Sequence, residues 1–241
     1  MKFRTLALVA AMSALTVACA SNSGGKSPAA TPNKPVGITP SLMSVTVNHN
    51  GKPVEIKRNQ DNNAKVIPAF ASTSRPCPPF CIQPISLAPG LETLGEVEII
   101  DYLKKQSDGD SSIVVIDSRT PDWVAKGTIP GSVNIPWTSL TTAKGATTEG
   151  ITKIMTNDFG VKLSKGADAF AVDEAIAAGD TSKVFDYSNA KTLVMFCNGM
   201  WCGQSPASIA TLLKFGYPAE KMKWYRGGMQ DWAILGLTTT K

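Results

Sequence analysis

From residue 92 onward, short continuous apolar runs alternate with stretches whose apolar residues recur at helical spacing. Runs of the first kind are typical of strands buried on both faces of a parallel sheet. They lie at residues 113–116, 133–135 and 193–196, and the helical patterns lie at residues 97–103, 167–178 and 209–213. This alternation predicts an α/β fold with a central parallel sheet that helices cover on both faces. Residues 141–166 and 179–190 carry little periodicity and are interpreted as part of a long insertion.

The region before residue 92 has a different pattern. Between residues 45 and 56, apolar and polar residues alternate on either side of Asn50-Gly51, which predicts a small β-hairpin beside the main sheet. Residues 74–90 are too rich in proline for regular structure. Thr93 with Glu96 then forms a capping box, which predicts a helix that ends near Lys105.

The first residues carry a targeting pattern. Lys2 and Arg4 precede an apolar run that ends in small residues, which is typical of a secretory signal over residues 1–18. Cys19 then becomes the first mature residue and the site of lipidation in a bacterial lipoprotein; ordinary cleavage after Ala20 is the alternative. The protein is therefore expected to be exported to the periplasm and anchored to a membrane through its lipid.

Four segments follow from this pattern: signal peptide 1–18, flexible tether 19–44, N-terminal extension 45–91 and the α/β domain 92–241. Removal of Lys2 and Arg4 with the signal lowers the formal net charge from +5 to +3. A charge this small and scattered does not favour nucleic acid as a partner. Apart from the signal, no segment reaches the ~20 apolar residues that cross a bilayer, so membrane contact is expected through the anchor alone.

Cys197 stands where the apolar run 193–196 ends and a glycine-bearing loop begins. Ser205 is interpreted as the N-cap, and Pro206 as the first residue, of the helix that follows. Backbone N–H groups of such a loop, together with the positive end of a helix, stabilise an anion and lower the pKa of a thiol below its usual ~8.5. This placement predicts a reactive thiolate, the alternative being an inert core cysteine.

Three further cysteines leave alternatives open. Cys202 can resolve an intermediate on Cys197, form a disulfide with it or be a plain loop residue. Cys77 and Cys81 are expected to form a structural disulfide in an exported protein, although a redox pair is also compatible with their spacing. The spacing disfavours a tetrathiolate zinc site formed by these three cysteines and Cys197, so no metal is expected.

Several motifs, in order, resemble a rhodanese-like (sulfurtransferase) domain over roughly residues 92–240. The motifs are Asp117-x-Arg119, the turn Gly127-x-Ile129-Pro130-Gly131 with Asn134-Ile135-Pro136, Cys197 at the head of its loop, and Gly227-Gly228 followed by Trp232. The resemblance implies a three-layer fold with a central parallel sheet. It also implies a cysteine that carries a sulfane sulfur as a persulfide.

The resemblance assigns roles to individual residues. Cys197 matches the sulfur carrier, and Ser205 matches the residue that closes the loop and caps the helix. Asp117 and Arg119 match an ion pair of supporting role. The persulfide-binding loop comprises Asn198, Gly199, Met200, Trp201, Gly203, Gln204 and Ser205.

The sequence departs from the family pattern at three places. The loop is two residues longer than in single-domain relatives, and Gln204 replaces a basic residue before the serine. No arginine lies between residues 198 and 204, which argues against a phosphatase, because phosphate is gripped by a bidentate guanidinium. Thr128 stands where many relatives have histidine, and the single histidine, His49, is interpreted as a solvated turn residue.

The expected function is transfer of a sulfane sulfur from thiosulfate or a persulfide to a thiophilic acceptor through a persulfide on Cys197. Arg226 is a candidate for the positive charge that binds the donor. The partners are then a small sulfur-containing anion, a thiol acceptor and a thiol reductant, and no cofactor is needed. The alternatives are a non-catalytic rhodanese-like binding module and a dithiol redox protein that uses Cys197 and Cys202.

Overall fold

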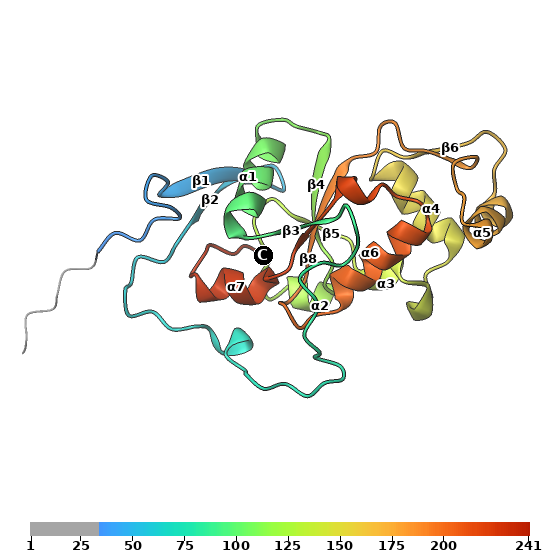
Figure 1. Ribbon diagram of the computed structural model, residues 1–241. Helices are drawn as coiled ribbons and strands as arrows, with labels where there is room; N and C mark the ends of the chain where they lie inside the picture. Colours follow the sequence, from blue (N-terminus) through green and yellow to red (C-terminus); the bar gives the residue numbers. More distant parts are fainter. Residues whose placement is uncertain (1–33) are drawn as a thin grey trace, which may run out of the picture. The chain divides into compact units, whose positions relative to one another are not determined.

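A five-stranded, wholly parallel sheet runs through the centre of the computed structural model, which describes residues 34–241 (Figure 1). The expected α/β architecture is confirmed. The strands, in spatial order, are β3 (Glu92–Leu94), β9 (Met222–Tyr225), β8 (Thr192–Phe196), β4 (Ile113–Asp117) and β5 (Val133–Asn134). The expected signal peptide and Cys19 lie outside the described residues.

Side chains alternate across this sheet and build one core on each face. In β4, Val115 packs into one apolar cluster and Ile116 into the other. In β8, Val194 and Phe196 belong to the first cluster, whereas Met195 belongs to the second. Successive residues of a strand point to opposite faces, so the continuous apolar runs correspond to strands that are buried on both sides.

Helices cover both faces. One face carries α1 (Glu96–Ser107) and α7 (Gly228–Ile234), together with the 3₁₀ turn η1 (Pro68–Phe70). The other face carries α3 (Trp137–Leu140), α4 (Thr148–Asn157), α5 (Ala169–Ala178) and α6 (Gln204–Lys214). The short helix α2 (Pro121–Val124) follows β4, and η3 (Ala219–Lys221) precedes β9. None of the helices within residues 34–241 is long and apolar enough to span a bilayer.

The N-terminal hairpin contributes to a core. Its strands, β1 (Ser44–His49) and β2 (Lys52–Lys57), pair antiparallel around Asn50-Gly51 as expected. Val47 and Ile56 are buried in the same cluster as the apolar side of α1. His49 is not simply a solvated turn residue, because its Nδ1 accepts a hydrogen bond from the Gly131 N–H at 3.1 Å. The histidine thus ties the hairpin to the turn that follows β4.

The start of α1 differs from the expectation. Thr93 lies in β3, and its hydroxyl donates to the Ile85 carbonyl, so it cannot cap a helix. The helix begins at Glu96 with Gly95 as N-cap, and the Glu98 carboxylate accepts from the Gly95 N–H. The predicted capping box was therefore wrong in register. Glu98, the third residue of the helix, makes the contact that was expected of Glu96, two positions earlier.

The long insertion between β5 and β8 is folded. The predicted helix near residues 167–178 corresponds to α5, but the rest of the insertion was not anticipated. Its other elements are α3, η2 (Thr142–Lys144), α4, and the antiparallel pair β6 (Lys162–Leu163) and β7 (Phe185–Asp186). Each element is short and takes its stability from packing on the sheet, which leaves weak periodicity in the sequence.

Candidate functional site

Cys197 follows β8 directly, at the carboxyl edge of the sheet. Asp117 ends the neighbouring strand β4, and it pairs in register with Phe196. The two strands therefore bring an acid and a thiol to one edge. Cys197 is only 2% exposed, and residues 197–203, here called the Cys197 loop, lead into the N-terminus of α6.

The surroundings of the Cys197 sulfur favour its ionised form. Burial raises the pKa of this thiol, but hydrogen bonds from the Cys202 thiol, the Ser205 hydroxyl and the N–H groups of Ser205 and Asn198 outweigh it and lower the pKa to about 7. In the neutral form, Cys197 instead donates its S–H to the Cys202 carbonyl, with Sγ and O 3.4 Å apart. Near neutral pH, a large fraction of Cys197 is thus the thiolate, the nucleophilic form.

Cys202 has the opposite chemistry. The hydrogen bond to Cys197, burial and the negative charge of that thiolate together raise its pKa. Both cysteines are free thiols, and both are buried. Cys202 therefore remains a protonated thiol and donates to Cys197 while Cys197 is the thiolate.

Ser205 is not the helix cap that the sequence predicts. The N-cap of α6 is Gly203, and Ser205 lies within the first turn, where its side chain caps no backbone group. Its hydroxyl is fully buried and has no other partner among the residues that the structure describes. The hydroxyl is thus free to turn its hydrogen toward the Cys197 sulfur from the first turn of the helix.

The start of α7 holds the Cys197 loop from behind. The N–H groups of Met229 and Gln230 donate to the carbonyls of Cys197 and Asn198, both at 3.0 Å. This close approach depends on Gly228, which has φ +54°. A Cβ on this residue would lie only 2.3 Å from the Cys197 carbonyl oxygen. Gly228 of the Gly227-Gly228 motif therefore permits direct backbone contact with the Cys197 loop.

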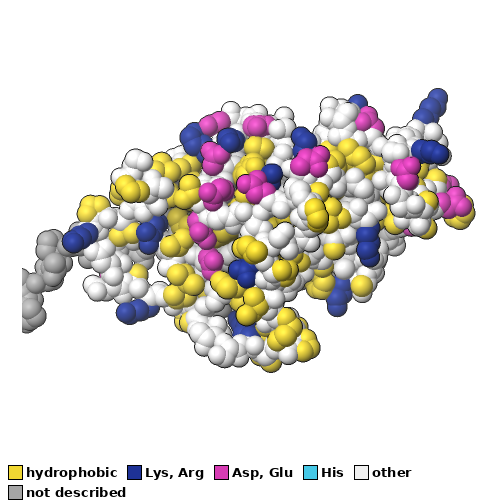
Figure 2. All heavy atoms as spheres, in the orientation of Figure 1, with side chains coloured by type: hydrophobic (Ala, Val, Ile, Leu, Met, Phe, Trp, Pro, Cys, Tyr) yellow, Lys and Arg dark blue, Asp and Glu magenta, His cyan; other side chains and the backbone are white. Residues whose placement is uncertain are grey.

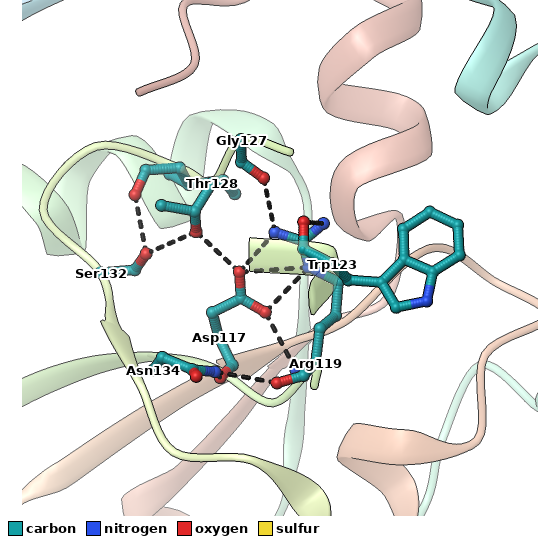
Figure 3. Close-up of polar contacts among 8 residues, drawn as sticks. Asp117, Arg119, Trp123, Gly127, Thr128, Ser132 and Asn134 are labelled. Atoms are coloured by element: carbon teal, nitrogen blue, oxygen red, sulfur yellow. Dashed lines mark hydrogen bonds and ion pairs between the residues drawn. The ribbon is translucent and has the colours of Figure 1, made fainter. Parts of the chain in front are cut away.

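Asp117 and Arg119 form a buried ion pair that organises the neighbouring turn (Figure 3). The Arg119 Nη2 donates to Asp117 Oδ2 at 2.6 Å and to the Gly127 carbonyl at 2.7 Å. Thr128 Oγ1 donates to the same carboxylate at 2.6 Å. The Asn134 side-chain amide donates to the carbonyls of Asp117 and Arg119. This supporting cluster fixes the segment that carries Trp123, whose carbonyl Arg119 also contacts.

The proline-rich strap, residues 74–90, lies against the Cys197 loop. A disulfide joins Cys77 and Cys81 in it, with Cα atoms 4.6 Å apart. The Gln83 N–H donates to the Met200 carbonyl at 2.8 Å, and Arg226 donates to the Gln83 carbonyl at 2.8 Å. Arg226 thus holds the strap and does not line the cavity described next, which differs from its expected role at the donor anion.

A cavity of about 460 Å³ opens between the strap and the Cys197 loop. Its base includes Asn198 and Cys202 of the Cys197 loop and Gln204, the first residue of α6. Its walls are mostly aromatic and come from four separate segments: Arg75, Pro79 and Phe80 of the strap, Trp123 of α2, Trp137 of α3, and Trp201 of the loop. Of these wall residues, the sequence analysis named only Trp201.

A sequence signal for the two other tryptophans existed. Trp123 and Trp137 both follow strands of the parallel sheet, and the loops after parallel strands gather at the edge that carries Cys197. Arg75 and Phe80 had no such signal, because the position of the strap depends on contacts with residues far away in the sequence, such as Met200 and Arg226.

The site offers a soft sulfur nucleophile next to a mostly aromatic cavity that Arg75 also lines. No arginine lies in residues 198–204, so the loop lacks the guanidinium that grips a phosphate. The Cys77–Cys81 disulfide uses two of the four sulfurs that a tetrathiolate site would need. Within residues 34–241, no three metal-ligating side chains are placed to share an ion.

Comparison with protein families finds a match to the rhodanese-like domain over residues 100–235. Similar solved structures include a Rhodopseudomonas palustris protein described as a possible tyrosine phosphatase, with 20% identity, coverage of 59% of this chain and 79% of that one, and a TM-score of 0.34. A rhodanese-related Thermoplasma volcanium protein has 15% identity and a TM-score of 0.31, and the match covers 62% of this chain and 97% of that one. A rhodanese-like domain from Anabaena has 16% identity and a TM-score of 0.29, and the match covers 54% of this chain and 99% of that one. The comparison with curated proteins finds no match.

Proposed function

The chain belongs to the rhodanese-like family, and from this membership and the site geometry we propose that it is a sulfurtransferase with a persulfide intermediate on Cys197. The Cys197 thiolate attacks the terminal sulfur of a donor such as thiosulfate or a persulfide. A new sulfur–sulfur bond forms, the donor's own sulfur–sulfur bond breaks, and the donor leaves with that electron pair as sulfite or a thiolate. A thiol or cyanide then removes the outer sulfur and regenerates the thiolate.

One observation carries this proposal. The buried Cys197 sulfur, at the carboxyl end of β8, receives enough hydrogen bonds from Cys202, Ser205 and the backbone to lower its pKa to about 7 despite its burial. An inert core cysteine has no such donors, and burial alone would raise its pKa. The same donors can stabilise the negative charge of a persulfide.

The proposal is tested by mass spectrometry of the reduced, intact protein after exposure to thiosulfate or polysulfide. The wild type is expected to gain one sulfur atom, and Cys197→Ser to gain none. Circular dichroism of both proteins controls for folding. No gain with any donor would support the alternative of a non-catalytic rhodanese-like binding module.

A dithiol cycle is the second candidate function, favoured by the contact between the Cys202 thiol and the Cys197 sulfur. In this cycle the Cys202 thiol passes its proton to the outer sulfur of the Cys197 persulfide and attacks the inner sulfur. The outer sulfur leaves as hydrosulfide and a Cys197–Cys202 disulfide remains, which a thiol reductant must reduce. In Cys202→Ser, the persulfide is then expected to persist longer than in the wild type; equal lifetimes would rule the cycle out.

Export to the periplasm and a lipid anchor on Cys19 remain part of the proposal. The Cys77–Cys81 disulfide supports an oxidising compartment, because structural disulfides persist there and are rare in the cytosol. Mass analysis of the mature N-terminus would test the anchor. A diacylated Cys19 supports it, and an unmodified residue 21 at the N-terminus supports ordinary cleavage after Ala20.

A further inference from the structure

We propose that the Cys77–Cys81 disulfide is an exchange site for a partner protein with a reactive dithiol, and that its reduction loosens the wall of the cavity beside Cys197. The disulfide is then a redox switch for access to the site. This switch goes beyond sulfur transfer and does not depend on it. Three features carry it: the place of the disulfide in the strap, the few contacts that hold that part of the strap, and the exposed side chains around the disulfide.

The disulfide encloses part of the cavity wall. Pro79 and Phe80 lie between the two joined cysteines, and both line the cavity. Phe80 meets Trp201 edge to face, with ring centroids 5.3 Å apart. Arg75 lies over the same indole, 4.3 Å from the ring centroid. The covalent ring therefore shapes the segment that packs on the Cys197 loop.

Few other contacts hold this half of the strap. Within the described residues, no hydrogen bond joins residues 74–82 to a segment outside the strap. Such bonds begin at Gln83, whose backbone bonds to the Cys197 loop and to Arg226. The first half of the strap is thus held by its contacts with Trp201 and by the shape that the disulfide imposes on it.

Reduction removes the stronger of these two constraints. In the chain-entropy relation, closing a ring of this size changes an equilibrium about thirtyfold. The contacts with Trp201 remain after reduction, but one aromatic pair changes an equilibrium only about tenfold or less. We therefore expect reduction to raise the population of strap that has left the Cys197 loop by about three- to thirtyfold.

The disulfide is within reach of an external thiol. Cys77 is exposed and Cys81 is only partly buried, whereas the free thiols Cys197 and Cys202 are both buried. Thiol–disulfide exchange requires that a thiolate reach one of the bonded sulfurs, and exposed disulfides are the labile ones. An attacking thiolate therefore meets the Cys77 sulfur first.

The side chains around the disulfide indicate the kind of reductant. Ile82 and Ile85 follow it and are 79% and 68% exposed. No aspartate or glutamate lies between residues 62 and 91. The lower edge of the molecule, where Figure 1 shows the strap, carries hydrophobic and basic side chains in Figure 2. Exposed apolar side chains next to a reactive group are typical of protein contacts, so this surface fits a dithiol protein with an apolar face.

The exchange balances with the partner's dithiol as the reductant. One thiolate of the partner bonds to the Cys77 sulfur, the bond to Cys81 breaks, and Cys81 leaves with that electron pair. The second thiol of the partner gives its proton to Cys81 and attacks its own neighbouring sulfur, which releases Cys77 as a thiolate that takes up a proton. The strap gains two electrons and two protons, and the partner is left as a disulfide.

Exchange is tested with reduced thioredoxin as the dithiol protein and with dithiothreitol as the small dithiol. The thiols formed at Cys77 and Cys81 are trapped with N-ethylmaleimide and followed by peptide mass spectrometry. Both reductants are expected to open the disulfide in the folded wild type. A disulfide that resists both of them would overturn the proposal.

Surface variants test the docking of the partner. Ile82→Ser combined with Ile85→Ser is expected to slow reduction by thioredoxin about three- to tenfold and to leave the rate with dithiothreitol unchanged. Phe170→Ser is the matched control, because Phe170 is 69% exposed and lies in α5, within the insertion. If the isoleucine variant reacts with thioredoxin as fast as this control, the strap is not the docking surface.

Hydrogen exchange tests the hold of the disulfide on the strap. The Gln83 N–H bonds to the Met200 carbonyl at 2.8 Å and reports whether the strap is docked. In Cys77→Ser/Cys81→Ser, its exchange is expected to be about three- to thirtyfold faster than in the oxidised wild type. The Thr192 N–H, which bonds to the Ser112 carbonyl at 2.7 Å, is expected to stay unchanged.

The wild type reduced with dithiothreitol replaces the double variant if that variant does not fold. Unchanged exchange at Gln83 would show that the disulfide does not hold the strap. Equal acceleration at Gln83 and Thr192 would show a general loss of stability. Either result overturns the switch.

Alkylation of Cys197 tests whether the strap controls access. Cys197 is 2% exposed, so iodoacetamide reaches it only when its surroundings open. The maximal rate in Cys77→Ser/Cys81→Ser is expected to rise about three- to tenfold, with the midpoint still at about pH 7, because the groups that lower this pKa lie outside the strap. An unchanged rate would show that the strap does not gate the site. None of these measurements uses sulfur transfer, so their outcome is separate from that of the proposed function.

Discussion

Two polar clusters lie at the same edge of the sheet, one at the end of β4 and one at the end of β8, and they differ in how completely their atoms are paired. The Asp117 carboxylate accepts from Arg119 and Thr128, and Arg119 also donates to backbone carbonyls (Figure 3). In the other cluster, Asn198 Oδ1 and Gln204 Oε1 have no hydrogen-bond partner within the described residues, and the Ser205 hydroxyl has none apart from the Cys197 sulfur.

The difference indicates that the Asp117–Arg119 cluster supports the structure, whereas the polar groups around Cys197 take part in its chemistry. A fully paired buried network is rigid and costs free energy when broken, so the Asp117–Arg119 cluster behaves as a structural device. Unpaired polar atoms around a thiol cost stability unless a ligand or the thiolate uses them. The polar atoms around Cys197 retain this unsatisfied capacity, as expected for a site that must stabilise a negative charge on sulfur.

The largest expected effect comes from breaking the paired cluster. Arg119→Ala leaves the Asp117 carboxylate buried without its counter-ion and is expected to lower the free energy of unfolding by ~3–5 kcal/mol. Urea unfolding followed by circular dichroism measures it. Lys104→Ala, which removes an exposed ion pair with Asp108, is the control and is expected to change little. A similar small effect of both variants would contradict the structural role.

The contact between α7 and the Cys197 loop comes next. Gly228→Ala places a Cβ 2.3 Å from the Cys197 carbonyl oxygen at φ +54° and is expected to cost about 2–3 kcal/mol. Gly179→Ala is the matched control, because Gly179 has φ +73° and open space where its Cβ would lie. In the control, the free energy of unfolding is expected to fall only by the cost of placing an alanine at a positive φ. If both variants lose the same stability, close packing behind the loop is not needed.

The pH dependence of Cys197 tests the unpaired cluster directly. Its alkylation by iodoacetamide in the wild type is expected to reach half its maximal rate at about pH 7, rather than near the ordinary thiol value of ~8.5. A depressed folded-state pKa adds stability that is fully present above the unfolded pKa. We therefore expect the wild type to lose ~2 kcal/mol of its free energy of unfolding, relative to Cys197→Ser, as the pH falls from ~8.5 through about 7. An alkylation midpoint above pH 8 would contradict the proposed thiolate.

The smallest effect concerns one donor of that cluster. Ser205→Ala removes a hydroxyl that lowers the pKa of Cys197, so the alkylation midpoint is expected to move upward and the thiolate population at pH 7 to fall about two- to tenfold. Ser208→Ala removes another buried, unpaired hydroxyl of α6 and is the control. A midpoint that moves equally in both variants would show that helix packing, not the hydroxyl, sets the pKa.

Much of the fold follows from local pattern. The apolar runs at residues 113–116 and 193–196 correspond to β4 and β8, because a strand buried on both faces needs apolar residues at every position. The Asn50-Gly51 hairpin follows from turn chemistry. Errors arose where a side chain had two potential partners: Thr93 bonds to the strap, and Ser205 faces the sulfur, although both residue types favour helix caps.

The aromatic cavity depends on contacts between distant segments. Phe80 joins Trp123 and Trp137 in the cavity lining because Gln83 of the strap bonds to the Cys197 loop and to Arg226. No periodicity or spacing encodes such a contact, since it depends on the relative positions of three loops.

The sequence by itself thus determined the parallel sheet, the family and the place of Cys197 at the end of a strand, because these depend on residues close together in the chain. The tertiary structure alone decided which groups surround the sulfur and what covers it. The physical reason is that the pKa of a buried thiol and the shape of a cavity both depend on atoms within a few ångströms in space, whichever part of the chain supplies them.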